Sequence, residues 1–265
     1  MDPDFTPAHR GGSGTPLVLL HGFTDTWRTW DLVMPELERH HEVFAPTLPG
    51  HAGGPDLTIP VSQEQVLDQV EAILDDAGIG VAHLAGNSLG GYLALRLAAR
   101  GRAKSVVALA PAGGWAAGDE SFRETLDFFV SMKAQLEGAE PHLDALVASP
   151  EGRRLATQFI TTNYEHIPAD LIAHQIRGVI RCEGAAALIQ SGLDEGWSLD
   201  AEKVTCPVRM VWGTEDRVLA WPGTAARYRD EWLPHAEWIE MPGIGHCPQL
   251  DVPAETAQLI LGFTD

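Results

Sequence analysis

The hydrophobic positions of this chain form short apolar runs, separated by longer segments with helical spacing. One such segment begins at a capping box formed by Ser62 and Gln65, and its apolar face comprises Val66, Val70, Ile73 and Leu74. Apolar runs of this kind are typical of strands that are buried on both faces of a sheet. The runs up to residue 110 comprise residues 17–20, 43–45 and 105–110, with a further strand before Ser88. Strand and helix therefore alternate, which predicts an α/β fold with a mostly parallel sheet and helices on both faces.

The alternation breaks after residue 110. From about Trp115 to Trp197 the spacing is helical and no clear strand is present, and Pro168 occupies a first-turn position of one helix. Alternation then resumes with a strand at 208–212, a helix near 222–231, a strand at 237–241 and a helix near 253–263. We therefore expect a core of residues 1–115 and 198–265, with residues 116–197 inserted as a helical cap, or lid, over the site.

A tight turn joins the strand that ends near residue 87 to the following helix. Gly86, Ser88 and Gly90 form the pattern G-x-S-x-G in this turn. In a nucleophile elbow the backbone turns so sharply that its flanking positions cannot carry side chains, and the serine is held with its Oγ exposed. The turn also places the serine at a helix N-terminus, where free N–H groups favour negative charge. The pattern therefore predicts a nucleophilic serine.

A serine hydroxyl needs a base, and a histidine base is usually oriented by a carboxylate. Asp216 follows the strand at 208–212, and His246 follows the strand at 237–241. Functional groups gather at the carboxyl ends of parallel strands, so these side chains are expected to converge with Ser88. Glu215 is an alternative acid, and Asp194 is a weaker one.

Four ordered motifs span nearly the whole chain: HGF at 21–23, GNSLGG at 86–91, GTEDRV at 213–218 and GIGHCPQLDVPAE at 243–255. With them the chain resembles the α/β-hydrolase superfamily, in its form with a helical cap after the sixth strand. The resemblance implies that Ser88 is the nucleophile, Asp216 the orienting acid and His246 the general base. It also implies an oxyanion hole formed by the backbone N–H groups of Phe23 and Leu89. Only about 16 residues precede the first clear strand, so the usual N-terminal hairpin is expected to be shortened.

Composition narrows the possible partners. The chain has 265 residues and a net charge of -19, from 37 acidic and 18 basic residues. This charge argues against nucleic acid and anionic membranes as partners. No run of 18 apolar residues predicts a membrane span, and the N-terminus lacks the features of a signal peptide. We expect a cytoplasmic protein, monomeric or homodimeric, that acts on a small molecule.

Cofactor and metal motifs are not recognised in the sequence. The three cysteines are widely spaced, which argues against a disulfide framework and against a zinc site. Gly11–Gly14 precedes its strand and therefore lacks the context of a dinucleotide fingerprint. We expect neither a cofactor nor a bound metal.

The favoured function is hydrolysis of a small to medium carboxylic ester through an acyl-enzyme intermediate. Phe129 and Phe159 are candidates for an apolar substrate pocket, and Arg177 is a candidate for binding a substrate carboxylate. The alternative is hydrolysis of a carbon–carbon bond in ring-cleavage dienoic acids. Against that alternative, Cys247 follows the predicted base where many such hydrolases resemble one another in having tryptophan. Lactonase and menaquinone-pathway lyase activities remain open, and a non-catalytic ligand-binding relative is a third class.

Overall fold

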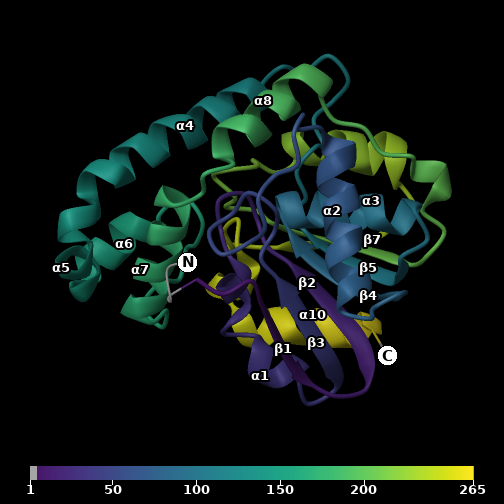
Figure 1. Ribbon diagram of the computed structural model, residues 1–265, viewed down its shortest axis with the longest axis horizontal. Helices are drawn as coiled ribbons and strands as arrows, with labels where there is room; N and C mark the ends of the chain where they lie inside the picture. The colour runs from purple at the N-terminus through teal and green to yellow at the C-terminus, as the bar shows by residue number, and fades with distance from the viewer. Residues whose placement is uncertain (1–4, 265) are drawn as a thin grey trace.

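Seven strands form one sheet in the computed structural model, which describes residues 5–264 (Figure 1). The strand order is β1-β3-β2-β4-β5-β6-β7, and only β1 runs antiparallel to its neighbour, β3. The strands are β1 (Ala8–Gly12), β2 (Thr15–Leu20), β3 (His41–Pro46), β4 (Ala82–Asn87), β5 (Ala103–Leu109), β6 (Val208–Gly213) and β7 (Glu237–Met241). The expected mostly parallel sheet is confirmed.

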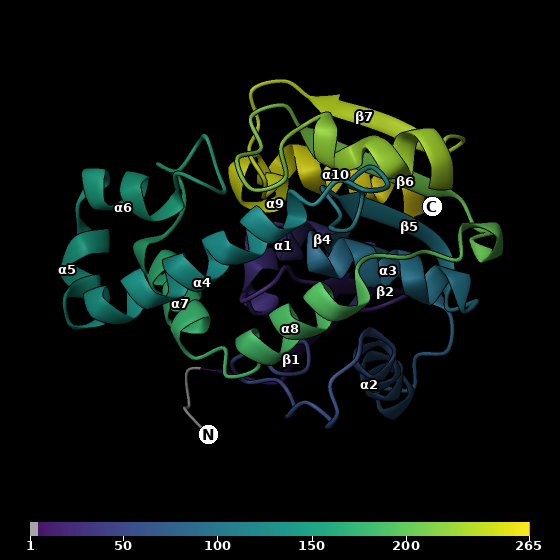
Figure 2. The same ribbon diagram turned by 90° about the horizontal axis from the view of Figure 1, so that it is seen from above.

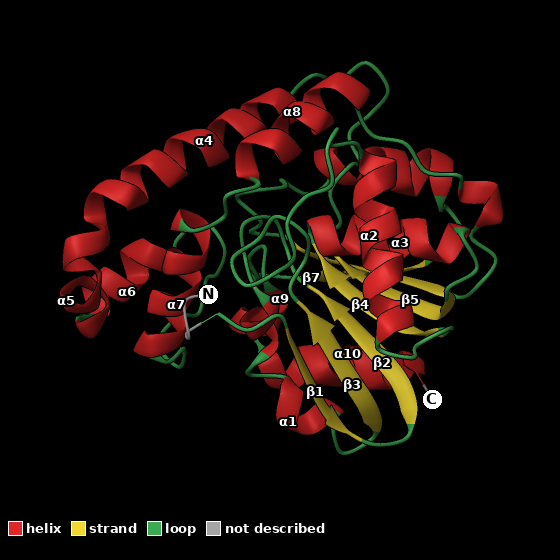
Figure 3. Ribbon diagram, viewed as in Figure 1, coloured by secondary structure: helices red, strands yellow, loops and turns green. Residues whose placement is uncertain are grey.

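Helices cover both faces of the sheet (Figure 3). On one face, α2 (Gln63–Asp76) and α3 (Leu89–Ala99) pack against the strands through a large apolar cluster that includes Val70 and Leu97. On the other face, α1 (Met34–Leu37) and α10 (Pro253–Thr264) form a second cluster. Successive residues of one strand enter different clusters, since Val18 belongs to the first and Leu19 to the second. This alternation explains why the strands are apolar throughout.

Two segments differ from the sequence-based expectation. The edge strand β1 was not predicted because its sequence, AHRGG, is polar, and it pairs with β3 rather than with the adjacent β2. The helix expected near 222–231 is instead two short pieces, η4 (Gly223–Ala225) and a wide turn, η5 (Tyr228–Trp232). Between the two pieces the Arg227 N–H donates to the distant Gly114 carbonyl at 2.8 Å instead of to a helical carbonyl. The buried Tyr228 hydroxyl donates to the Ala112 carbonyl at 2.6 Å.

The segment between β5 and β6 is helical (Figures 1 and 2). It contains α4 (Phe122–Ala139), η2 (Glu140–His142), α5 (Leu143–Ala148), α6 (Pro150–Thr157), α7 (Ala169–Ile180) and α8 (Ala185–Glu195). The remaining short elements are η1 (Trp27–Trp30), η3 (Ala201–Lys203) and α9 (Pro248–Asp251). Figure 2 shows α4 and α8 lying beside one another, with α5, α6 and α7 at one end of the molecule. Among residues 5–264, no helix is long and apolar enough to cross a lipid bilayer.

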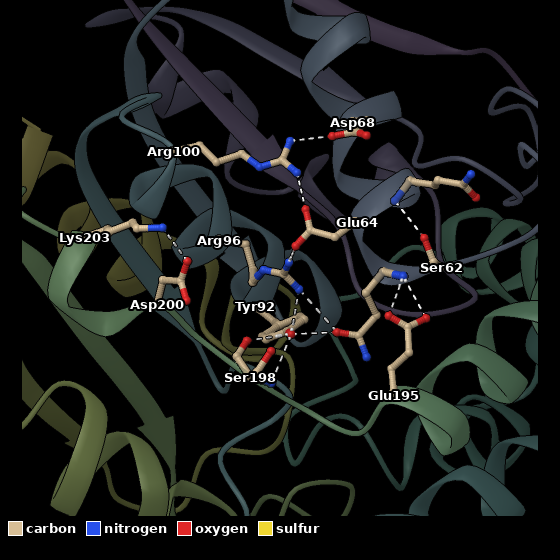
Figure 4. A network of polar contacts seen from close by, with 12 residues as sticks. Ser62, Glu64, Asp68, Tyr92, Arg96, Arg100, Glu195, Ser198, Asp200 and Lys203 are labelled. Carbon is tan, nitrogen blue, oxygen red and sulfur yellow. Dashed lines mark hydrogen bonds and ion pairs between the residues drawn. The ribbon is translucent and has the colours of Figure 1, made fainter.

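A polar network ties the end of this helical segment to α2 and α3 (Figure 4). The carboxylate of Glu195 accepts a hydrogen bond from the Gln63 backbone N–H, over 3.2 Å to Oε1. The buried hydroxyl of Tyr92 donates to the Ser198 carbonyl at 2.8 Å. Arg96 stacks over the Tyr92 ring and pairs with Glu64. The exit of the helical segment is therefore held against the sheet domain by buried as well as exposed contacts.

Candidate active site

Ser88 lies in a strained turn between β4 and α3. Its backbone angles are φ 56° and ψ -117°, a conformation that L-residues rarely adopt. A Cβ atom at Gly86 would overlap the carbonyl of Gly90, and one at Gly90 would overlap the carbonyl of Leu20. Both flanking positions therefore need glycine, and the G-x-S-x-G spacing follows from this close packing.

Asp216 and His246 are hydrogen-bonded to each other. His246 Nδ1 lies 2.7 Å from Asp216 Oδ2, and both residues are buried. The other carboxylate oxygen, Oδ1, accepts hydrogen bonds from the backbone N–H groups of Val218 (2.8 Å) and Leu219 (2.7 Å). Glu215 is exposed, so the geometry favours Asp216 as the partner of the histidine. Asp194 is exposed on α8, where it accepts a hydrogen bond from Gln190.

One cavity brings Ser88 and His246 together. It lies between the carboxyl ends of the strands and the helical segment, and its wall includes the backbone of Gly22 and Phe23. Within the described residues, Ser88 Oγ makes no hydrogen bond, so a contact with the imidazole would be completed in the substrate complex. Catalytic hydrogen bonds are often long before substrate binds.

The two backbone N–H groups that the sequence predicts as an oxyanion hole belong to segments next to Ser88. The N–H of Leu89 is the first of α3, where no earlier helical carbonyl can accept it. The loop after β2 lies beside the Ser88 turn, since a Cβ on Gly22 would be in van der Waals contact with the Ser88 Cβ, at 3.4 Å. The neighbouring Phe23 lines the same cavity as Ser88. This arrangement is suited to stabilising an oxyanion.

Two residues that the sequence reasoning missed hold the loop that carries His246. Asn87 Nδ2 donates to the His246 carbonyl at 3.0 Å, which joins this loop to the Ser88 turn. The buried carboxylate of Asp251 accepts from the N–H of Gly245 at 2.7 Å and from that of Thr162 at 3.0 Å. The loop is therefore fixed to both the sheet and the helical segment. For Asn87 a signal existed, since it directly precedes Ser88.

The cavity around Ser88 is mostly apolar. Phe129 and Phe159, both predicted as pocket residues, lie in its wall. Arg177 does not: its guanidinium pairs with Asp144 of α5 at 2.7 Å, while its neighbours Gln175, Ile176 and Val179 line the cavity. The structure therefore does not bring Arg177 to the candidate site. Helical geometry explains this, because Arg177 projects from a different face of α7 than its lining neighbours.

A second, almost wholly apolar cavity adjoins the first. The two share Phe23 and Phe129, whose rings meet edge to face with centroids 5.0 Å apart. Its other lining residues come from α2, α3, α4, α8 and the loops between, and include Leu89, Leu93, Leu126, Leu188 and Trp197. The aromatic pair is thus a partition between two apolar spaces, one of which contains Ser88.

Asp25 is a further polar residue of the Ser88 cavity that the sequence reasoning missed. Burial raises the pKa of its carboxyl to about 6, although hydrogen bonds from neighbouring groups lower it. An Asp whose pKa is raised by folding weakens the folded state when it ionises. This loss of stability is absent at low pH, where the carboxyl is protonated in both the folded and the unfolded chain. It grows as pH rises from about 4 to about 6.

Asp25→Asn is therefore expected to stabilise the protein at pH 8, by on the order of 2 kcal/mol in the free energy of unfolding. The gain should vanish below about pH 4, since the wild-type carboxyl is then neutral in the folded and unfolded chain. Urea unfolding of both proteins at pH 4 and pH 8 measures this difference. An equal stability difference at the two pH values would contradict the raised pKa.

Two other buried histidines, His21 and His51, lie against each other near the site, and neither lines the Ser88 cavity. His21 Nδ1 lies 2.8 Å from the Gly22 carbonyl and its Nε2 accepts from the Leu48 N–H at 2.9 Å, so both ring nitrogens are engaged. Burial lowers the pKa of His21 well below its usual value, and lowers that of His51 to about 4. In the part of the chain that the structure describes, no group of three or more His, Cys, Asp or Glu residues could hold a metal ion.

Sequence comparison places these features in a known context. Residues 17–259 match the sequence profile of a family described as "Alpha/beta hydrolase family". The epoxide hydrolase EphH of Mycobacterium tuberculosis is 29% identical over 206 residues, covering 77% of this chain and 96% of that protein. A pimeloyl-[acyl-carrier protein] methyl ester esterase of Nitrosomonas europaea is 27% identical over 259 residues, covering 92% of this chain and 93% of that protein.

Solved structures share the fold. A putative lipase from Acinetobacter baumannii superposes with a TM-score of 0.75 at 20% identity, covering 96% of this chain and 85% of the lipase chain. The names of the relatives refer to different reactions. The relatives named here are hydrolases that act on different substrates, and the solved structure shares the fold.

Proposed function

The chain belongs to the alpha/beta hydrolase family, and from this premise we propose that it is a serine hydrolase that cleaves a small to medium carboxylic ester. One observation carries the proposal. His246, hydrogen-bonded to Asp216, lines the same cavity as Ser88, which is held in a strained turn. No cofactor is needed for this chemistry.

The reaction proceeds in two steps. Ser88 Oγ attacks the ester carbonyl while His246 Nε2 accepts its proton, and Asp216 stabilises the imidazolium through Nδ1. The N–H groups of Phe23 and Leu89 bind the oxyanion of the tetrahedral intermediate. His246 then donates its proton to the leaving alkoxide, which departs as the alcohol and leaves an acyl group on Ser88. Water, deprotonated by His246, releases the carboxylic acid and restores the serine.

The helical segment acts as the cap over this site, and α4 forms part of the wall of both cavities. Phe128, Phe129 and Met132 of α4 line the Ser88 cavity, and Leu126 lines its neighbour. The leaving group must lie beside His246, so the acyl chain points away from the histidine. The second cavity lies on that side, next to Leu89, and its apolar wall suits a hydrocarbon chain. The Phe23–Phe129 pair then limits the length of the acyl chain.

Phe129→Ala is expected to shift the preference toward longer acyl chains. Removing the ring joins the two cavities, so additional methylenes leave water, and the shift in relative kcat/KM should correspond to about 1–3 kcal/mol. Initial rates with p-nitrophenyl esters from acetate to dodecanoate measure it. Phe159→Ala should have a smaller effect, because Phe159 lines only the Ser88 cavity and is 42% exposed.

Val130→Ala is a matched control on the same helix. Val130 is 54% exposed and lines neither cavity, so its variant should keep the wild-type chain-length profile. If Phe129→Ala and Val130→Ala gave the same profile, the second cavity would not be the acyl site.

The lining of the Ser88 cavity argues against the alternative function, hydrolysis of a carbon–carbon bond in a dienoic acid. A substrate carboxylate needs a cation, yet no Lys or Arg is among the described residues that line the Ser88 cavity, and Asp25 adds a carboxylate to it. These charges favour a neutral substrate. A panel of neutral esters, lactones and dienoic acids tests the proposal: turnover of esters supports it, and turnover of the dienoic acid alone overturns it.

A further inference from the structure

Asp25 is an acidic side chain in an otherwise nearly apolar active-site cavity. It lines the cavity that contains Ser88 and His246, and it belongs to the loop that supplies the Phe23 N–H group. The residue lies deep within the protein but keeps some accessible surface. Because it is part of the cavity wall, a bound substrate can reach this surface.

A strained turn holds Asp25 in this position. The Asp25 N–H donates to the Gly22 carbonyl over 3.3 Å, which closes a turn, and Thr24 within it has a φ of 64°. A positive φ is unfavourable for a β-branched residue and persists only where the surroundings enforce it. The same turn fixes the Phe23 backbone, so the geometry of the carboxyl group and that of the oxyanion site are coupled.

The protein only partly satisfies the Asp25 carboxylate. Oδ1 accepts from the Thr26 N–H at 2.8 Å, and Oδ2 has a long contact of 3.4 Å with Gln175 Nε2. The Thr29 side chain is a third hydrogen-bond partner of this carboxyl group. Among residues 5–264 no cation pairs with this group, and the nearby Arg28 instead pairs with Asp31 at 2.8 Å. A buried carboxylate without a cation needs further hydrogen-bond donors, and a substrate can supply one.

We propose that Asp25, supported by Gln175, determines specificity by accepting a hydrogen bond from a hydroxyl group on the alcohol half of the ester. This inference rests on the proposed ester hydrolysis. The alcohol half is assigned here because its oxygen must receive a proton from His246, which lines the same cavity as Asp25. The acyl half extends from Ser88 toward the Phe23–Phe129 pair, which lines both cavities. The preferred substrate is thus an apolar acyl chain esterified to a hydroxylated alcohol.

The test compares esters that differ only in the donor. The pairs are 2-hydroxyethyl with propyl, 3-hydroxypropyl with butyl, and 4-hydroxybutyl with pentyl butyrate, each with equal numbers of heavy atoms. For the pair of matching length, wild type is expected to prefer the hydroxylated ester by at least about tenfold in kcat/KM, measured at pH 8. Butyl 6-hydroxyhexanoate and butyl heptanoate carry the same comparison on the acyl side, where no preference is expected.

Asp25→Asn keeps an oxygen for the Thr26 N–H but removes the charge, and Asp25→Leu removes the acceptor altogether. The preference for the hydroxylated ester should fall severalfold in the first variant and be lost or reversed in the second. Turnover of the plain alkyl esters should fall by a smaller factor than turnover of the hydroxylated esters. Asp31→Asn is the control, because Asp31 belongs to the same segment but does not line the cavity, and this variant should keep the wild-type preference.

The possible outcomes separate the role of Asp25 from the proposed ester hydrolysis. If wild type cleaves both esters of every pair equally well, the inference is overturned and the ester hydrolase proposal stands. If Asp25→Asn slows both esters of a pair by the same factor, Asp25 only supports the loop, and the inference is again overturned. A preference for the donor on the acyl side overturns the assignment to the alcohol half. If wild type cleaves none of the esters, the proposed function itself fails.

Discussion

Ser88→Ala is expected to lower kcat for ester hydrolysis by about 10⁴ to 10⁶-fold while leaving the fold intact. The loss is large because a serine, its base and the orienting acid act as a unit, so removing the nucleophile also removes what the base and the acid contribute. The substitution removes one oxygen atom that makes no hydrogen bond within the described residues, so circular dichroism and the unfolding midpoint should change little. Steady-state rates with a p-nitrophenyl ester measure the effect.

Ser121→Ala is the matched control. Ser121 precedes α4, and its side chain makes no capping hydrogen bond to that helix. This variant should retain wild-type rates. Activity of Ser88→Ala near that of wild type would exclude the serine mechanism.

His246→Ala is expected to cost a factor similar to that of Ser88→Ala, because no other histidine is among the described residues that line the cavity with Ser88. Asp216→Asn should cost somewhat less, about 10⁴-fold, since the imidazole remains but loses the carboxylate that orients it and stabilises its charge. Its amide would oppose the 2.7 Å contact with Nδ1 in one orientation and favour the wrong tautomer. Rates for purified variants, with folding checked by unfolding midpoints, measure both effects.

Glu215→Gln separates the two adjacent acids. Glu215 is exposed while Asp216 is buried against the histidine, so this variant should keep nearly full activity. A far larger loss in Glu215→Gln than in Asp216→Asn would reverse the assignment of the orienting acid.

Much of the fold could be predicted from the sequence because burial leaves a clear pattern. The apolar run at 17–20 lies in β2, and the strand expected at 237–241 is β7. Edge strand β1 could not be found in this way, since one polar strand at the rim carries no apolar run. The interrupted helix near residue 228 makes long-range contacts, such as that of Tyr228 with Ala112, which local spacing does not contain.

The candidate site was predictable where residue type and strand position together fix the chemistry. Ser88, Asp216 and His246 each follow the carboxyl end of a strand, and a parallel sheet brings those ends together. Residue type and sequence position do not fix the direction in which a helical side chain points. Arg177 and Gln175 lie two residues apart on α7, yet only Gln175 lines the cavity. Asp25 was missed because its partner Gln175 on α7 is distant in sequence.

The most direct test of the central claim is labelling with a fluorophosphonate, followed by peptide mass spectrometry. Such reagents phosphonylate a serine that an adjacent base has activated, so the result does not depend on knowing the substrate. Stoichiometric modification of Ser88, lost in His246→Ala, is the result expected of a serine hydrolase built on this site. Labelling of another residue, or none in a folded protein that hydrolyses esters, would contradict it.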